Sequence, residues 1–101
     1  MMPQSVKDKT GRELQLRRMG VLEQLRLFKA LGPELSENRA YMGLARIAAS
    51  VAVVDGVPLP FPAHEAGIEA ALERLGEDGV EAVGTILLAS DERDLAAEAG
   101  N

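Results

Sequence analysis

Residues 50–62 read SVAVVDGVPLPFP, and this stretch decides the fold class. Residues 51–54 are small or β-branched, as in a strand, and they lead directly into Asp55-Gly56, a dipeptide typical of a tight two-residue hairpin. Residues 57–62 then place a proline at every second position. Because proline has no N–H to donate, this second strand is predicted to lie at a sheet edge or to extend as a stiff arm.

A second hairpin is predicted over residues 4–18. Val6 precedes the turn-forming run at 8–11, after which Leu14 and Leu16 alternate with polar residues. The N-terminal part of the chain is therefore expected to contribute two more strands.

The rest of the chain has apolar residues at helical spacing. Four helices are predicted, at about 20–31, 38–51, 63–75 and 79–89. Gly32-Pro33 ends the first, Ser36 or Asn38 caps the second, and Gly76 ends the third in a left-handed conformation. The predicted fold class is α+β, mainly α.

The chain has 101 residues and is predicted to form one small domain over residues 1–90, followed by an acidic, frayed tail at 91–101. The expected core combines the apolar faces of the helices with Val51. It comprises Val21, Leu22, Leu25, Phe28, Leu31, Leu44, Ile47, Ala48, Val51, Ile68, Leu72, Leu75, Val83 and Leu87.

Charge is divided unequally along the chain. Residues 1–50 have a net charge of +4 and residues 51–101 of −9, giving −5 in total. The cations are spread singly and only 3% of residues are aromatic, so nucleic-acid binding is not favoured. The two halves are expected either to attract each other within the fold or to join copies head to tail as a homo-oligomer.

The sequence has no cysteine, which excludes a disulfide framework and favours an intracellular setting. No apolar run of a signal peptide or a membrane-spanning helix is present, so no membrane association is expected.

No catalytic, cofactor or metal site is predicted. His64 is the sole histidine, and its neighbour Glu65 would point about 100° away on a helix. Glu65, Glu69 and Glu73 form a carboxylate row without a second histidine, which is typical of a solvated face. No serine has the flanking glycines of a nucleophile elbow.

The expected binding element is the proline-rich strand, which presents Val57, Leu59 and Phe61. Its three prolines restrict the backbone in advance, so binding would cost little further conformational entropy. The same side chains could instead pack over the helices as part of the core. A second candidate face is the alanine-rich helix at Tyr41, Ala45 and Ala48, where small residues permit close approach of a neighbour.

The order of these elements resembles the phage tail assembly chaperone family. The resemblance rests on an opening GRxLxLRRMG at residues 11–20, a leucine-rich helix, an alanine-rich helix, and DGVPxPFP at residues 55–62 followed by an acidic helix. It covers roughly residues 8–90 and contains no catalytic fingerprint.

The resemblance implies a small, mainly helical, non-enzymatic protein of the host cytoplasm that is absent from the mature virion. It implies binding to the tape measure protein and the tail tube subunit. A small cytoplasmic adaptor or regulatory subunit is the alternative, and a small enzyme centred on His64 is a third.

Overall fold

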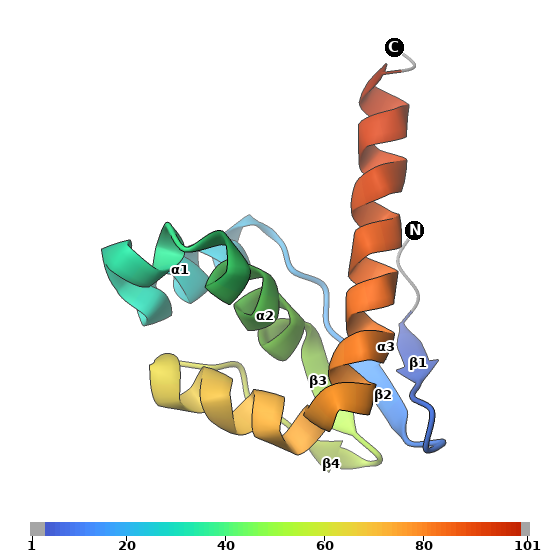
Figure 1. Ribbon diagram of the computed structural model, residues 1–101. Helices are drawn as coiled ribbons and strands as arrows, with labels where there is room; N and C mark the ends of the chain where they lie inside the picture. The colour runs from blue at the N-terminus through green and yellow to red at the C-terminus, as the bar shows by residue number, and fades with distance from the viewer. Residues whose placement is uncertain (1–3, 100–101) are drawn as a thin grey trace.

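The computed structural model describes residues 4–99, with side chains described as far as Ala89. Seven elements follow one another along the chain (Figure 1). They are β1 (Ser5–Lys7), β2 (Glu13–Leu16), α1 (Val21–Ser36), α2 (Arg39–Ser50), β3 (Val51–Val54), β4 (Val57–Pro58) and α3 (Glu65–Ala99). The mixed, helix-rich architecture agrees with the predicted class.

The four strands form one antiparallel sheet in the order β1-β2-β3-β4. Asp55 and Gly56, between β3 and β4, have φ of 49° and 85°, as a two-residue hairpin turn requires. Both predicted hairpins are present, and β4 lies at the sheet edge as its prolines predicted. The second strand predicted over residues 57–62 is too long, since β4 ends at Pro58 and residues 59–62 are in no strand; prolines at alternate positions cannot donate to a ladder.

Helix α2 begins at a capped end and runs straight into the central strand β3. The side chain of Asn38 accepts a hydrogen bond from the Tyr41 amide at 3.0 Å, which satisfies one orphan donor of the first turn. Of the two predicted caps, Asn38 is therefore the one used. Ala45, Ala48 and Ala49 are buried and let α1 and α3 approach the α2 backbone closely.

Helix α3 covers the stretch predicted as two helices. Gly76 has φ 67° and ψ −178°, so the helix bends there; one part lies along α2 and the other rises away from it (Figure 1). The predicted break at Gly76 is correct, but a single element spans both segments. The helix continues to Ala99. The prediction of an acidic, frayed tail at 91–101 is not tested further, because the side chains from residue 90 on and residues 100–101 lie outside the described part.

Helix α1 has a similar irregularity at Gly32, where φ is 81°. The helix predicted over about 20–31 does break at Gly32, but Pro33 then begins a further helical turn that ends at Ser36 and that the sequence did not predict. Pro33 needs no N–H at such a start, so the chain bends and continues.

The core has two parts. One, between the helices, contains Leu27, Leu31, Ala45, Ala48, Ala49, Ile68 and Ala71. The other, between the sheet and α3, contains Leu14, Val51, Val54, Leu75 and Val83.

The predicted core is partly wrong. Leu31, Ala48, Val51, Ile68, Leu75 and Val83 are buried, and Ile47, Leu72 and Leu87 are partly buried. Val21, Leu22, Leu25, Phe28 and Leu44 are exposed. The physical reason on α1 is that this helix packs mainly on α2 and turns Leu27 and Leu31 towards the core, so that among the described residues no element covers its other apolar face.

Candidate partner-binding surface

An uncovered apolar strip runs along α1. We define it as Val21, Leu22, Leu25 and Phe28, whose exposed fractions lie between 43% and 78%. Val21, Leu25 and Phe28 are spaced by four and three residues, so they share one side of the helix over two turns. Contiguous large apolar side chains at the surface of a soluble domain are typical of an interaction site.

Two cations on α1 lie close to the strip. Arg26 and Lys29 are exposed, and within residues 4–89 no hydrogen bond or ion pair is formed by either side chain. Together with Ala30 they line a hollow of about 420 Å³, whose opposite wall is formed by residues 61–63. The surface beside the strip is thus apolar and positively charged.

The wall of that hollow belongs to the proline-rich segment, which Arg17 fastens to the sheet. Arg17 Nη2 donates to the carbonyl oxygens of Val51 at 2.9 Å and Leu59 at 2.5 Å. Its guanidinium also lies 5.4 Å from the centre of the Phe61 ring, within cation–π range. Burial lowers the pKa of Arg17. Arg17, which directly follows β2, therefore contributes two hydrogen bonds and a ring contact that hold the segment in place.

On the α3 side of the same segment lies a second hollow, of about 470 Å³. Leu59, Phe61 and Pro62 form one wall, and Gly67 and Ala71 from α3 belong to the lining. Gly67 is close to Pro62, since a Cβ placed on this glycine would lie 3.4 Å from the Pro62 Cα. The segment thus has a hollow on each side.

Of the six residues predicted to bind a partner, the structure gathers five around one core. Ala45 and Ala48 are buried, and Tyr41, Leu59 and Phe61 pack against the same helical core. Val57 stands apart on β4 with 46% exposure. This placement favours the alternative that Leu59 and Phe61 pack over the helices as part of the core. The binding role of the six residues stays a prediction.

Tyr41 has an unusual environment. Burial raises the pKa of its hydroxyl, and the carboxylates of Glu65 and Glu69 act in the same direction. The hydroxyl oxygen is buried without a hydrogen-bond partner among the described residues. These observations place the start of α2 against the start of α3.

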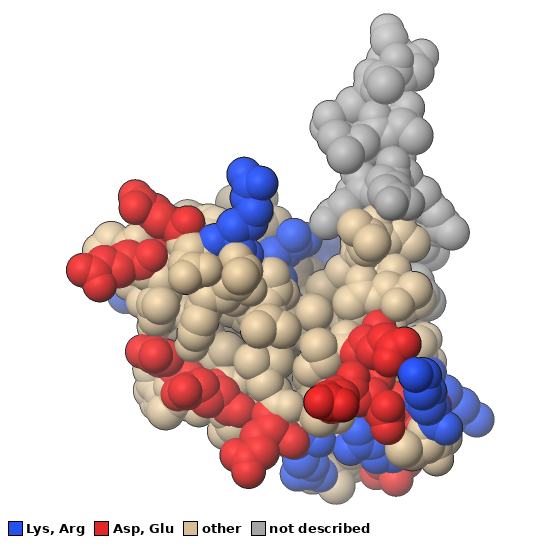
Figure 2. Space-filling model, viewed as in Figure 1, with Lys and Arg blue, Asp and Glu red and all other residues tan. Residues whose placement is uncertain are grey.

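Acidic side chains dominate a different part of the surface. Glu65, Glu69 and Glu73 are exposed on α3 before its bend, where Figure 2 shows a row of negative charge. His64, also exposed, precedes this row, and its carbonyl accepts hydrogen bonds from the Gly67 and Ile68 amides. Among the described residues, no group of three or more His, Asp or Glu side chains is arranged to hold a metal ion.

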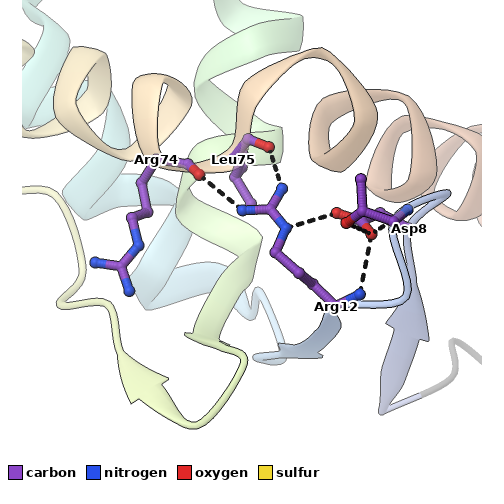
Figure 3. A network of polar contacts seen from close by, with 5 residues as sticks. Asp8, Arg12, Arg74 and Leu75 are labelled. Carbon is purple, nitrogen blue, oxygen red and sulfur yellow. Dashed lines mark hydrogen bonds and ion pairs between the residues drawn. The ribbon is translucent and has the colours of Figure 1, made fainter.

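A partly buried polar cluster contacts the bend of α3 (Figure 3). Arg12, from the β1–β2 turn, donates to the carbonyl oxygens of Arg74 at 3.2 Å and Leu75 at 2.6 Å, which precede the bend at Gly76. Arg12 Nε also donates to Asp8 Oδ2 at 2.8 Å, which holds the guanidinium in place. Asp8 and Arg12 pair with each other and with the last carbonyls before the bend, so we assign the cluster a structural role.

The Asp8 carboxylate is itself enclosed by donors. It accepts hydrogen bonds from the Thr10 hydroxyl and amide and from the Arg12 amide. The hydrogen bond from the Thr10 hydroxyl contributes most to lowering the pKa of Asp8 to about 2, and Arg12 lowers it further. The carboxylate is therefore charged at neutral pH.

The α1 strip is the feature that sequence reasoning missed, because the residues that form it were assigned to the core. The available signal was the width of the apolar surface: Leu27 and Leu31 occupy a different side of the helix from Val21, Leu25 and Phe28. One neighbouring helix cannot cover both sides.

Comparisons with protein-family models, curated proteins and solved structures found no match for this chain. Within the described residues, none of the helices combines the length and apolarity needed to cross a membrane.

Proposed function

We propose that this chain is a non-enzymatic assembly chaperone that holds an apolar segment of another protein. The observation that carries the proposal is the exposure of four large apolar side chains close together on α1, whereas α2 and the described part of α3 expose single leucines, Leu44 and Leu88. Full burial of each would contribute about 1.5–3 kcal/mol. A client that covers the strip therefore gains binding energy without a change in the fold.

The sequence resemblance supplies the proposed clients. The motifs at residues 11–20 and 55–62 support the tape measure protein and the tail tube subunit as partners. On this proposal the chain acts in the host cytoplasm while phage tails assemble and is absent from the finished virion. A long, apolar, helical client needs such cover until tube subunits enclose it.

The test is co-expression of the tagged chain with the tape measure protein or the tail tube subunit, followed by co-purification. Leu25→Asp places a charge in the middle of the strip and is expected to abolish capture. Leu88→Asp is the matched control, since Leu88 is 62% exposed on α3 and lies outside the strip. Circular dichroism must show that both variants retain the parent's helicity and melting temperature.

The proline-rich strand needs a separate variant. Leu59 and Phe61 pack against the core, so replacing them tests stability and binding together. Val57→Ser changes an exposed side chain on β4 and isolates the contribution of that strand. Capture of neither tail protein by the parent chain would contradict the proposed function and favour the alternative of a small adaptor.

A further inference from the structure

We propose that the α1 strip, with Arg26 and Lys29 beside it, binds an amphipathic helix whose apolar stripe is flanked by carboxylates. This inference rests on the proposed function and specifies the chemistry of the client segment. It depends on three features of the described surface: the spacing of the strip, the unpaired cations next to it, and the charge of the rest of the chain.

The spacing of the strip selects a helical client. Val21, Leu25 and Phe28 extend over two turns, about 10 Å along the helix axis. A second helix matches this arrangement with apolar side chains at its own three- and four-residue spacing, as ridges pack into grooves. Leu22 widens the strip on one side. An extended client, whose side chains alternate every two residues, would leave much of this surface uncovered.

Charge complementarity selects an acidic client. Arg26 and Lys29 are exposed and, among the described residues, unpaired. The acidic residue of the first turn, Glu23, points elsewhere: a Cβ placed on Gly20 would lie 3.1 Å from Glu23 Oε2, so this carboxylate lies at the helix N-terminus. Carboxylates on a docked helix would reach Arg26 and Lys29 across the edge of the strip.

The chain's own acidic helix is a poor occupant. Between Glu65, Glu69 and Glu73, the exposed positions of α3 include Ala66 and Ala70, which offer little apolar area. A second copy that docked through this part of α3 would therefore satisfy the cations but not the strip. The observations favour a different protein.

An anionic membrane surface is also disfavoured. Amphipathic helices that lie on membranes combine an apolar face with many cations, whereas α1 has two beside its strip. The chain as a whole has a net charge of −5 and would be repelled by anionic lipid.

The experiment uses two synthetic helical peptides of about 18 residues, long enough to form helix in part. Both have leucines at three- and four-residue spacing; one has glutamate and the other lysine at the flanking positions. Fluorescence anisotropy with the full-length chain, at physiological ionic strength, measures both affinities. We expect the glutamate peptide to bind at least about fivefold more tightly, as two partly screened ion pairs allow.

Three variants test whether the peptides bind at the α1 strip and its two cations. The double variant Arg26→Glu/Lys29→Glu should reverse the preference between the two peptides, and Leu25→Asp should abolish binding of both. Leu88→Asp should leave both affinities unchanged. Circular dichroism confirms that each variant is folded, which is expected because all four side chains are exposed.

Equal affinity for the two peptides, or undiminished binding by Leu25→Asp, would overturn the inference. So would tighter binding to vesicles of phosphatidylcholine and phosphatidylglycerol than to the glutamate peptide, or self-association that Leu25→Asp abolishes. If a tail protein is captured through Leu25 but the peptides are not distinguished, the proposed function survives and this inference fails. If the peptides are distinguished but no tail protein is captured, the proposed function fails and the surface assignment stands.

Discussion

Two leucines on α1 offer a direct test of how this helix is oriented. Leu27 and Leu25 have the same side chain and lie two residues apart on one helix. Leu27 is 1% exposed in the helical core, whereas Leu25 is 57% exposed on the strip. Replacing each with alanine therefore compares a buried leucine with an exposed one at almost constant helix propensity.

The expected losses of stability differ severalfold. Leu27→Ala removes buried methyl groups and leaves a cavity, which should lower the free energy of unfolding by about 2–5 kcal/mol. Full burial of a leucine contributes about 1.5–3 kcal/mol, and Leu25 is less than half covered, so Leu25→Ala should cost about 1 kcal/mol or less.

Urea unfolding followed by circular dichroism measures both losses, with thermal unfolding as a second measurement. For a domain of this size, Leu27→Ala should lower the melting temperature by at least about 8 °C, and Leu25→Ala by much less. Equal destabilisation by the two variants would show that α1 buries its strip, and would remove the basis of the binding surface.

Two further predictions concern charge. The pKa of Asp8, about 2 in the fold, lies below its value in the unfolded chain, so its contribution to stability is complete above about pH 4 and is lost as the pH falls towards 2. Asp8→Asn should therefore make the free energy of unfolding, measured by urea titration, less dependent on pH between 4 and 2; an unchanged dependence would contradict this. The opposite net charges of the two halves of the chain predict weak head-to-tail association of copies. In light scattering, the mean mass should fall as salt rises and should be the same for Leu25→Asp, and a salt-independent mass would exclude electrostatic association.

Local signals in the sequence predicted the turns and irregularities of the fold. Asp55-Gly56 defines its hairpin through the backbone preferences of two adjacent residues. Gly76 and Gly32 were recognised as breaks for the same reason, since glycine readily adopts positive φ. Local signals predicted a helix after Gly76 but not the helical turn after Gly32, which depends on the packing of residues 33–36.

The orientation of α1 needed information that periodicity does not contain. Its apolar residues occupy two sides of the helix, and the choice between Leu27 and Leu25 as the buried residue depends on where α2 lies. The same limit applies to Arg12, whose hydrogen-bond acceptors are carbonyls more than 60 residues away along the chain. Only the assembled fold shows that the β1–β2 turn stabilises the bend of α3.

The proline-rich strand bears on how a client can be bound. Strand addition requires a sheet edge with free N–H and C=O groups. The amide of Leu59 donates inward to the Ala52 carbonyl, and N–H groups alternate in direction along a strand. The position next to it on β4 is that of Pro58, which has no N–H to donate outward. This edge offers a client strand few donors, and on the proposed function the client is recognised through side chains, for which α1 presents the larger apolar surface.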